Sequence, residues 1–127
     1  MSFQIRYDNQ KRVVRMLLYG EATYANRVEA VRQLVAKYGH LEPLRVFADV
    51  RRVSKMSMTL EEQKRFGVYL GEVPALNGAR VAILNRAELN TTAVMRNKAR
   101  DAGLVLHSFL TEGAAMKWLT SAAEVPS

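Results

Sequence analysis

Hydrophobic and polar residues near the N-terminus alternate with the two-residue period of a β-strand. Phe3, Ile5 and Tyr7 are apolar and polar residues separate them, which is the pattern of a strand with one buried face. Residues 8–10, Asp-Asn-Gln, favour a turn. Residues 13–19 are apolar apart from one arginine, as in an interior strand that is covered on both faces. We therefore expect an edge strand followed by a central strand.

Two helices are predicted from apolar residues that recur at three- and four-residue spacings. The first covers residues 24–38, with Thr23 as its N-terminal cap and Gly39 ending it in a left-handed conformation. The second begins at Leu60, because residues 59–62, Thr-Leu-Glu-Glu, form a capping box. Pro74 prevents this helix from continuing.

Three more strands and two more helices complete the pattern. Short apolar runs predict strands at residues 44–50, 79–84 and 104–110. Helices are predicted over residues 91–102, closed by Gly103, and over residues 112–122, capped by Thr111. Strands that alternate with helices form mostly parallel sheets. The fold class is therefore α/β: one domain over residues 1–122, with a mostly parallel five-stranded sheet flanked by four helices, and a frayed tail at residues 123–127.

Polar side chains follow two neighbouring strands at the carboxyl edge of this sheet, where ligands of such folds bind. Asp49 is followed by Arg51, Arg52 and Lys55, and Arg86 follows the next strand. Together with the free amides of two helix starts, we expect the basic residues to bind a phosphate, a sulfate or an acidic side chain. The alternative is a solvated surface on which Asp49 pairs with an arginine or with loop amides.

Two methionines, Met56 and Met58, stand in a predicted polar loop at residues 53–58. Methionine is usually kept for cores and for adaptable binding surfaces. Exposed, these side chains would offer a contact to a partner, an apolar ligand or a membrane surface. The alternative is that one or both fold back onto the second helix.

Composition excludes several classes of protein. The 127 residues contain no cysteine, which excludes disulfides and thiolate-bound metals. No apolar run approaches the ~20 residues that span a bilayer, and the first residues lack the pattern of a secretory signal. We expect a soluble, cytoplasmic protein.

The charge is strongly positive, with 19 Lys and Arg against 12 Asp and Glu. Positive charge attracts nucleic acids, anionic lipids and acidic proteins. On the first helix, however, Arg27, Arg32 and Lys37 are five residues apart and do not share one face. We therefore expect a solvated helix surface and no specific nucleic-acid site.

Motifs for catalysis are absent from the sequence. There is no glycine-rich phosphate loop and no G-x-S-x-G elbow. His40 and His107 lie far apart in the sequence and have no partner at metal-ligand spacing. We expect no catalytic residue, no cofactor and no metal, and a structural role for His107.

Three stretches of the chain resemble a known family. They are Leu17-Leu18-Tyr19-Gly20-Glu21-Ala22-Thr23, Arg45-Val46-Phe47-Ala48-Asp49-Val50 and Phe109-Leu110-Thr111-Glu112-Gly113-Ala114-Ala115-Met116-Lys117-Trp118-Leu119. With the order of elements, they are similar to the SpoIIAA-like proteins within the STAS domains, which are named for sulfate transporters and anti-sigma factor antagonists. The resemblance covers nearly the whole chain.

The resemblance implies a non-enzymatic regulatory or ligand-binding domain. In the anti-sigma antagonist branch, a serine in an Asp-Ser-Ser-Gly turn before the second helix is phosphorylated; here that place holds Ser57-Met58-Thr59-Leu60. Ser57 and Thr59 are therefore the candidate phosphorylation sites, although capping alone accounts for Thr59. We expect a protein partner or a small anionic ligand to contact Asp49, Arg51, Arg52, Lys55, Met58, Thr59 and Arg86. A homodimer is a separate expectation. The alternative is a membrane-surface-associated or lipid-binding carrier.

Overall fold

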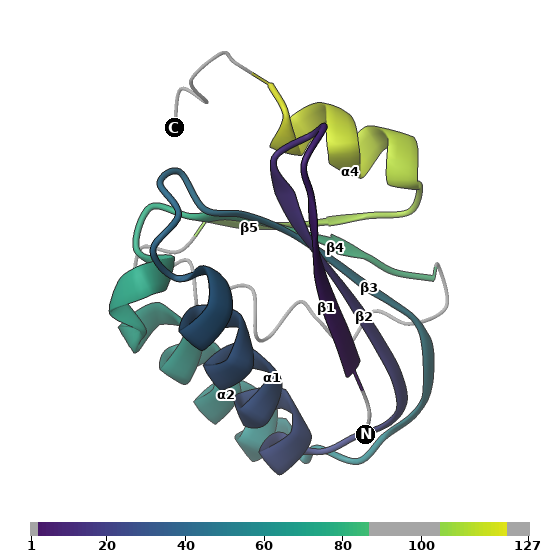
Figure 1. The fold of residues 1–127 in the computed structure, drawn as a ribbon. Coiled ribbons are helices and arrows are strands. Elements are labelled where there is room, and N and C mark those ends of the chain that lie inside the picture. Colours follow the sequence, from purple (N-terminus) through teal and green to yellow (C-terminus); the bar gives the residue numbers. More distant parts are fainter. Residues whose placement is uncertain (1–2, 87–104, 122–127) are drawn as a thin grey trace.

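The computed structural model describes residues 3–86 and 105–121, which form one five-stranded sheet with helices on both faces. The strands lie in sequence order: β1 (Phe3–Asp8), β2 (Val13–Ala22), β3 (Arg45–Met56), β4 (Arg80–Leu84) and β5 (Val105–Phe109). Strand β1 is antiparallel to β2, and the remaining neighbours are parallel (Figure 1). The predicted α/β fold and mostly parallel sheet are confirmed.

The helices are divided between the two faces of the sheet. Helices α1 (Tyr24–Tyr38) and α2 (Leu60–Glu72) lie on one face, and α4 (Glu112–Leu119) lies on the other (Figure 1). A short 3₁₀ turn, Pro74–Leu76, follows α2. The helix predicted at residues 91–102 and the tail at residues 123–127 lie outside the described residues.

The caps that the sequence predicts fix where these helices start. The Thr23 hydroxyl accepts a hydrogen bond from the Asn26 amide, and the Thr111 hydroxyl accepts one from the Ala114 amide. Thr59 and Glu62 form both hydrogen bonds of the capping box, each at 3.0 Å. Because these bonds satisfy amides at the helix starts, each loop turns into its helix at a fixed residue.

The left-handed ending predicted at Gly39 is wrong. Gly39 has φ −63°, a right-handed conformation open to any residue. The requirement for glycine comes instead from close packing, because a Cβ there would lie 2.5 Å from the Val35 carbonyl oxygen and 3.3 Å from the Ala75 side chain.

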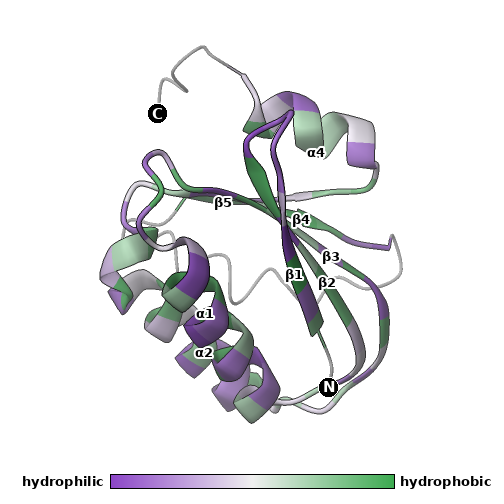
Figure 2. Cartoon of the chain, viewed as in Figure 1, coloured by the Kyte–Doolittle hydropathy of each residue, from purple (hydrophilic) through white to green (hydrophobic). Residues whose placement is uncertain are grey.

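Each face of the sheet has its own hydrophobic core. The larger core packs β2, β3 and β4 against α1 and α2 and includes Val14, Val46, Leu34 and Phe66. The smaller core packs Phe47 and the strands beside it against Leu119 and its neighbours in α4. Figure 2 shows hydrophobic residues along the strands and hydrophilic ones on the outer surface of α1 and α2.

Strand β3 is longer than its sequence pattern indicates. It also contains two extra residues relative to the paired part of β2. The predicted strand covers residues 44–50 and the predicted loop residues 53–58, whereas β3 continues to Met56. Its pairing with β2 shifts register twice, between Leu17 and Tyr19 and between Gly20 and Glu21. Such β-bulges interrupt the alternation of side chains, so the period of two no longer marks the end of the strand.

Candidate ligand cavity

A cavity of about 150 Å³ lies between the sheet and helices α1 and α2. Most of its lining is aliphatic and comes from all five of the elements β2, β3, β4, α1 and α2, for example Met16, Val46, Ile83, Val31 and Leu70. The aromatic ring of Phe66 is part of the same wall. The described residues of the larger core therefore leave a space between them, and most of its lining is apolar.

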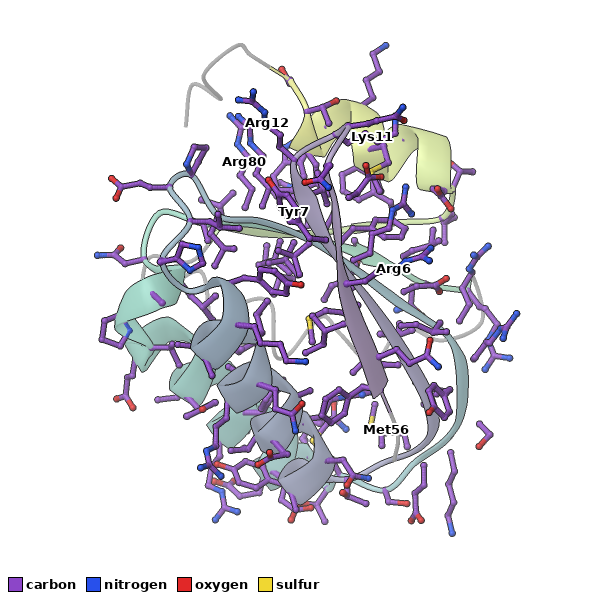
Figure 3. The ribbon with its side chains drawn as sticks, viewed as in Figure 1. Arg6, Tyr7, Lys11, Arg12, Met56 and Arg80 are labelled. Atoms are coloured by element: carbon purple, nitrogen blue, oxygen red, sulfur yellow. The ribbon has the colours of Figure 1, made fainter. Side chains whose placement is uncertain are left out.

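One end of the cavity is polar, and this end lies at the carboxyl edge of the sheet. The polar lining residues are Arg27 in the first turn of α1, Ser54 and Lys55 near the end of β3, and Asn85 and Arg86 directly after β4. Met56, which also lines the cavity, is labelled at this edge in Figure 3, and Lys11, Arg12 and Arg80 lie at the opposite edge. The described lining residues include no acidic side chain and no histidine.

Arg27 is the most deeply buried charged residue that the structure describes, with 8% of its surface exposed. Its backbone amide donates to the Thr23 carbonyl oxygen at 3.0 Å, which closes the first turn of α1. None of the hydrogen bonds and ion pairs of the described residues involves its guanidinium. Burial lowers the pKa of Arg27 to about 10, because desolvation disfavours the charged form.

Arg86 is held against the end of β3. Its Nη2 donates to the Val53 carbonyl oxygen at 3.2 Å, and its backbone amide donates to Oδ1 of Asn85 at 2.9 Å. The Asn85 amide in turn donates to the Phe109 carbonyl oxygen at 2.9 Å, and Asn85 is 5% exposed. The turn after β4 is thus tied to both neighbouring strands, which places the Arg86 side chain at the polar end of the cavity.

The sequence predicted that Arg51, Arg52, Lys55 and Arg86 come together from adjacent loops, and the structure separates them. The first three belong to β3. Lys55 and Arg86 line the cavity, whereas Arg51 bonds to Asp49 and Arg52 is exposed opposite Tyr19. Pairing with an arginine is therefore the observed state of Asp49, and its carboxylate faces Arg51 rather than the cavity.

The electrostatics of Asp49 follow from this pair. Burial acts to raise the pKa of Asp49, but hydrogen bonds from the Arg51 side chain and backbone outweigh it and hold the pKa below its usual value. Arg51 Nη2 lies 3.0 Å from Asp49 Oδ2. The pair has no net charge, so it attracts an anion less than an unpaired arginine would.

The turn before α2 buries one methionine and engages both hydroxyls. Met58 is 4% exposed within the larger core, so it has folded back and offers no surface to a partner. The Ser57 hydroxyl donates to the Glu21 carboxylate, and Thr59 caps α2. The proposed phosphorylation of Ser57 or Thr59 stays a prediction.

Comparisons with known proteins identify the fold. A scan against protein-family models finds no match. A search of curated proteins also finds none. Among solved structures, an uncharacterized protein of the DUF3478 family from Shewanella loihica PV-4, which has a SpoIIAA-like fold, matches with a TM-score of 0.60 and 16% sequence identity; the match covers 93% of this chain and 92% of that chain. This protein has a SpoIIAA-like fold. At so low an identity the likeness shows the fold alone.

Two further observations describe the SpoIIAA-like domain over residues 3–86 and 105–121. None of its helices there is both long enough and apolar enough to cross a membrane. In the same stretches, no three acidic or histidine side chains are grouped so that they could hold a metal ion.

The spacing of the basic residues predicts Arg27 on a solvated helix surface. The structure contradicts this, because Arg27 is buried and lines the cavity. A signal was present: position 27 falls three residues after Tyr24 and four before Val31, in the apolar stripe of the SpoIIAA-like domain's first helix. The spacing of the basic residues among themselves obscured their register with that stripe.

Proposed function

We propose that this SpoIIAA-like domain binds a small molecule with an apolar body in the cavity between the sheet and helices α1 and α2. The observation that carries the proposal is the cavity itself, about 150 Å³ in volume and lined mainly by aliphatic side chains. An apolar cavity of this size is large enough to hold a molecule such as benzene. Native cores are usually close-packed, so an unfilled space of this volume favours a binding role.

Binding without catalysis fits the lining of the cavity. General acid and base steps most often use histidine or a carboxylate within hydrogen-bond reach of the substrate. The described lining residues provide neither, and their polar groups are those of arginine, lysine, serine and asparagine. These groups donate hydrogen bonds and orient a ligand, so we propose a carrier or receptor rather than an enzyme.

The cavity unites two expectations from the sequence. Its polar end lies at the carboxyl edge, where the sequence placed an anionic ligand, and its apolar body suits the alternative of a lipid-binding carrier. A protein partner and contact with a membrane surface stay predictions. A ligand in the cavity would touch α1 and α2 together, so its presence could alter the surface that such a partner meets.

Nuclear magnetic resonance with toluene as the probe tests this function. Toluene is uncharged and close to benzene in size, so saturable shifts are expected for methyl groups that line the cavity, such as those of Val31 and Ile83. The variant Ala30→Leu adds volume at a buried lining position, which is 1% exposed, and should abolish the shifts. Ala36→Leu makes the same change at an exposed position of α1 and should leave them unchanged.

A second filling variant, Ala48→Val in β3, covers the case in which Ala30→Leu disturbs α1. Shifts that survive in folded Ala30→Leu and Ala48→Val proteins, or shifts confined to surface residues, would overturn the proposed function. Loss of binding in both, with binding kept in Ala36→Leu, supports it.

A further inference from the structure

We infer that the ligand of this cavity carries an anionic group, and that the buried guanidinium of Arg27 binds it. This inference rests on the proposed function and names the class of molecule that the cavity takes: a small amphiphile with one anionic end. A carboxylate and a phosphate monoester share this chemistry.

The first argument is the burial of Arg27 without a partner. Its exposed fraction is 8%, it lines the cavity, and none of the hydrogen bonds and ion pairs of the described residues involves its guanidinium. A guanidinium has five donors and stays charged at neutral pH. Burying such a group is costly unless it is paired. An anion in the cavity supplies the missing partner, through two parallel hydrogen bonds.

The second argument is position within the helix. Arg27 shares its face of α1 with Ala30, Val31 and Leu34, which are all buried. A methionine or leucine at position 27 would continue this apolar face without a charge to desolvate. A positive charge near a helix N-terminus also opposes the helix dipole. Local structure therefore gains nothing from an arginine here, whereas an anion beside it would interact favourably with both the guanidinium and the dipole.

The third argument is the sign of the remaining charges. The charged lining residues that the structure describes are Arg27, Lys55 and Arg86, all positive. The nearby carboxylate of Glu21 accepts from Ser57, and that of Asp49 accepts from Arg51. Arg27 is buried and Arg86 is half-buried, so their charges are less screened by water than that of Lys55, which is exposed. This excess of positive charge favours anions over cations.

The size of the cavity limits the rest of the ligand. A volume of about 150 Å³ suits an apolar body of benzene size. A short alkyl or aryl carboxylate, or the corresponding phosphate monoester, meets both requirements. Hexanoate, hexyl phosphate and hexan-1-ol are suitable probes, because they carry a similar alkyl chain with different end groups.

Calorimetric titration of the full chain with these three probes tests the inference. We expect hexanoate or hexyl phosphate to bind at least about tenfold more tightly than hexan-1-ol, since hydrogen bonds to a charged group strengthen binding by roughly that factor or more. In Arg27→Met this preference should disappear while hexan-1-ol still binds. Whichever anion binds more tightly identifies the end group. Arg32→Met, at an exposed arginine of the same helix that pairs with Glu29, should change neither affinity.

The stability of the ligand-free variant separates binding from a structural role. Arg27→Met should unfold at a higher temperature than the unchanged protein, because it removes an unpaired buried charge. A lower unfolding temperature would mean that Arg27 serves an internal ion pair, and would overturn the inference. So would equal affinities for hexanoate, hexyl phosphate and hexan-1-ol, although the proposed function would then stand. Failure of toluene to bind would instead remove the proposed function.

Discussion

The side chain of Arg51 lies along its own strand and bonds to both carboxylate oxygens of Asp49, with Nε 3.1 Å from Oδ1 and Nη2 3.0 Å from Oδ2. Asp49 also accepts from the Arg51 backbone amide at 3.0 Å. Two residues that the sequence assigned to an anion site thus neutralise each other. The candidate site is accordingly formed by Arg27, Lys55 and Arg86 on the other face of the sheet.

The pKa of Asp49 is expected to depend on Arg51. In the unchanged protein it lies below its usual value, so Asp49 contributes stability at pH above the unfolded-state pKa of 3.8, and this contribution is lost as the pH falls through the folded-state pKa. In Arg51→Ala the burial of Asp49 and the hydrogen bond from the backbone amide of residue 51 remain, but both side-chain hydrogen bonds are lost, so the pKa of Asp49 should rise. Carboxyl-carbon resonances followed against pH measure this. An unchanged titration of Asp49 in Arg51→Ala would contradict the pairing.

Replacing Arg27 should change how stability depends on pH. Its folded-state pKa of about 10 lies below the ordinary 12.5, so its charge destabilises the folded protein at neutral pH. Arg27→Met should therefore be more stable by about 1–3 kcal/mol at pH 7. This advantage should shrink as the pH rises above 10, where the folded protein releases the proton. Urea unfolding at pH 7 and pH 10.5 gives the two differences, and equal values would contradict the prediction.

The capping box at α2 should contribute measurably to stability. Thr59→Ala removes the oxygen that accepts from the Glu62 amide and should cost about 1 kcal/mol. Thr59→Ser keeps the oxygen and should cost much less. Urea unfolding at neutral pH compares them. Equal losses in both variants would mean that the threonine methyl group, not the cap, matters.

A negative charge should have opposite effects at the two candidate phosphorylation positions. Ser57 already donates to the Glu21 carboxylate, so Ser57→Asp places like charges together and should lower stability by about 0.5–1 kcal/mol. Thr59→Asp keeps an N-cap residue at the positive end of α2 and should be tolerated. Ser57→Ala is the control for loss of the hydrogen bond alone. Thermal unfolding ranks the three variants; a Ser57→Asp protein as stable as Ser57→Ala would contradict the argument.

Replacing a glycine by alanine should have opposite effects on stability at two positions. Gly39→Ala puts a Cβ 2.5 Å from the Val35 carbonyl oxygen and should destabilise the protein by about 1 kcal/mol or more. Gly113 lies in α4 with nothing within 4 Å of an added Cβ. Gly113→Ala should therefore stabilise it by about 0.5–1 kcal/mol. Paired unfolding curves test both signs, and a stabilised Gly39→Ala protein would show that the chain shifts easily there.

The sequence predicts the fold well where local chemistry decides. The starts of α1, α2 and α4 follow from single threonine caps, and the central strands follow from apolar runs. Prediction from the sequence fails where segments that are distant in the chain contact each other. The close packing at Gly39 involves Ala75 as well as the nearby Val35, and the length of β3 depends on its pairing with the far end of β2.

The candidate site was harder to predict for the same reason. Lys55 and Arg86 were placed at the correct edge, because the strand ends fix it. The cavity is a volume that several elements leave unfilled, which no local pattern records. Arg27 was missed because a charged residue in an apolar stripe looks like an exposed one until the partner surfaces are known.

The two extra residues of β3 decide which of its side chains line the cavity. Up to Val50, alternate residues of the strand face the cavity, as Val46, Ala48 and Val50 do. Strict alternation would next turn Arg52 inward, but the first bulge turns Val53 inward instead and leaves Arg52 exposed. Without the bulge, the same sequence would place Arg52 against the cavity and turn Val53 away from it. The lining of the cavity is thus set as much by the number of residues in β3 as by the identity of its side chains.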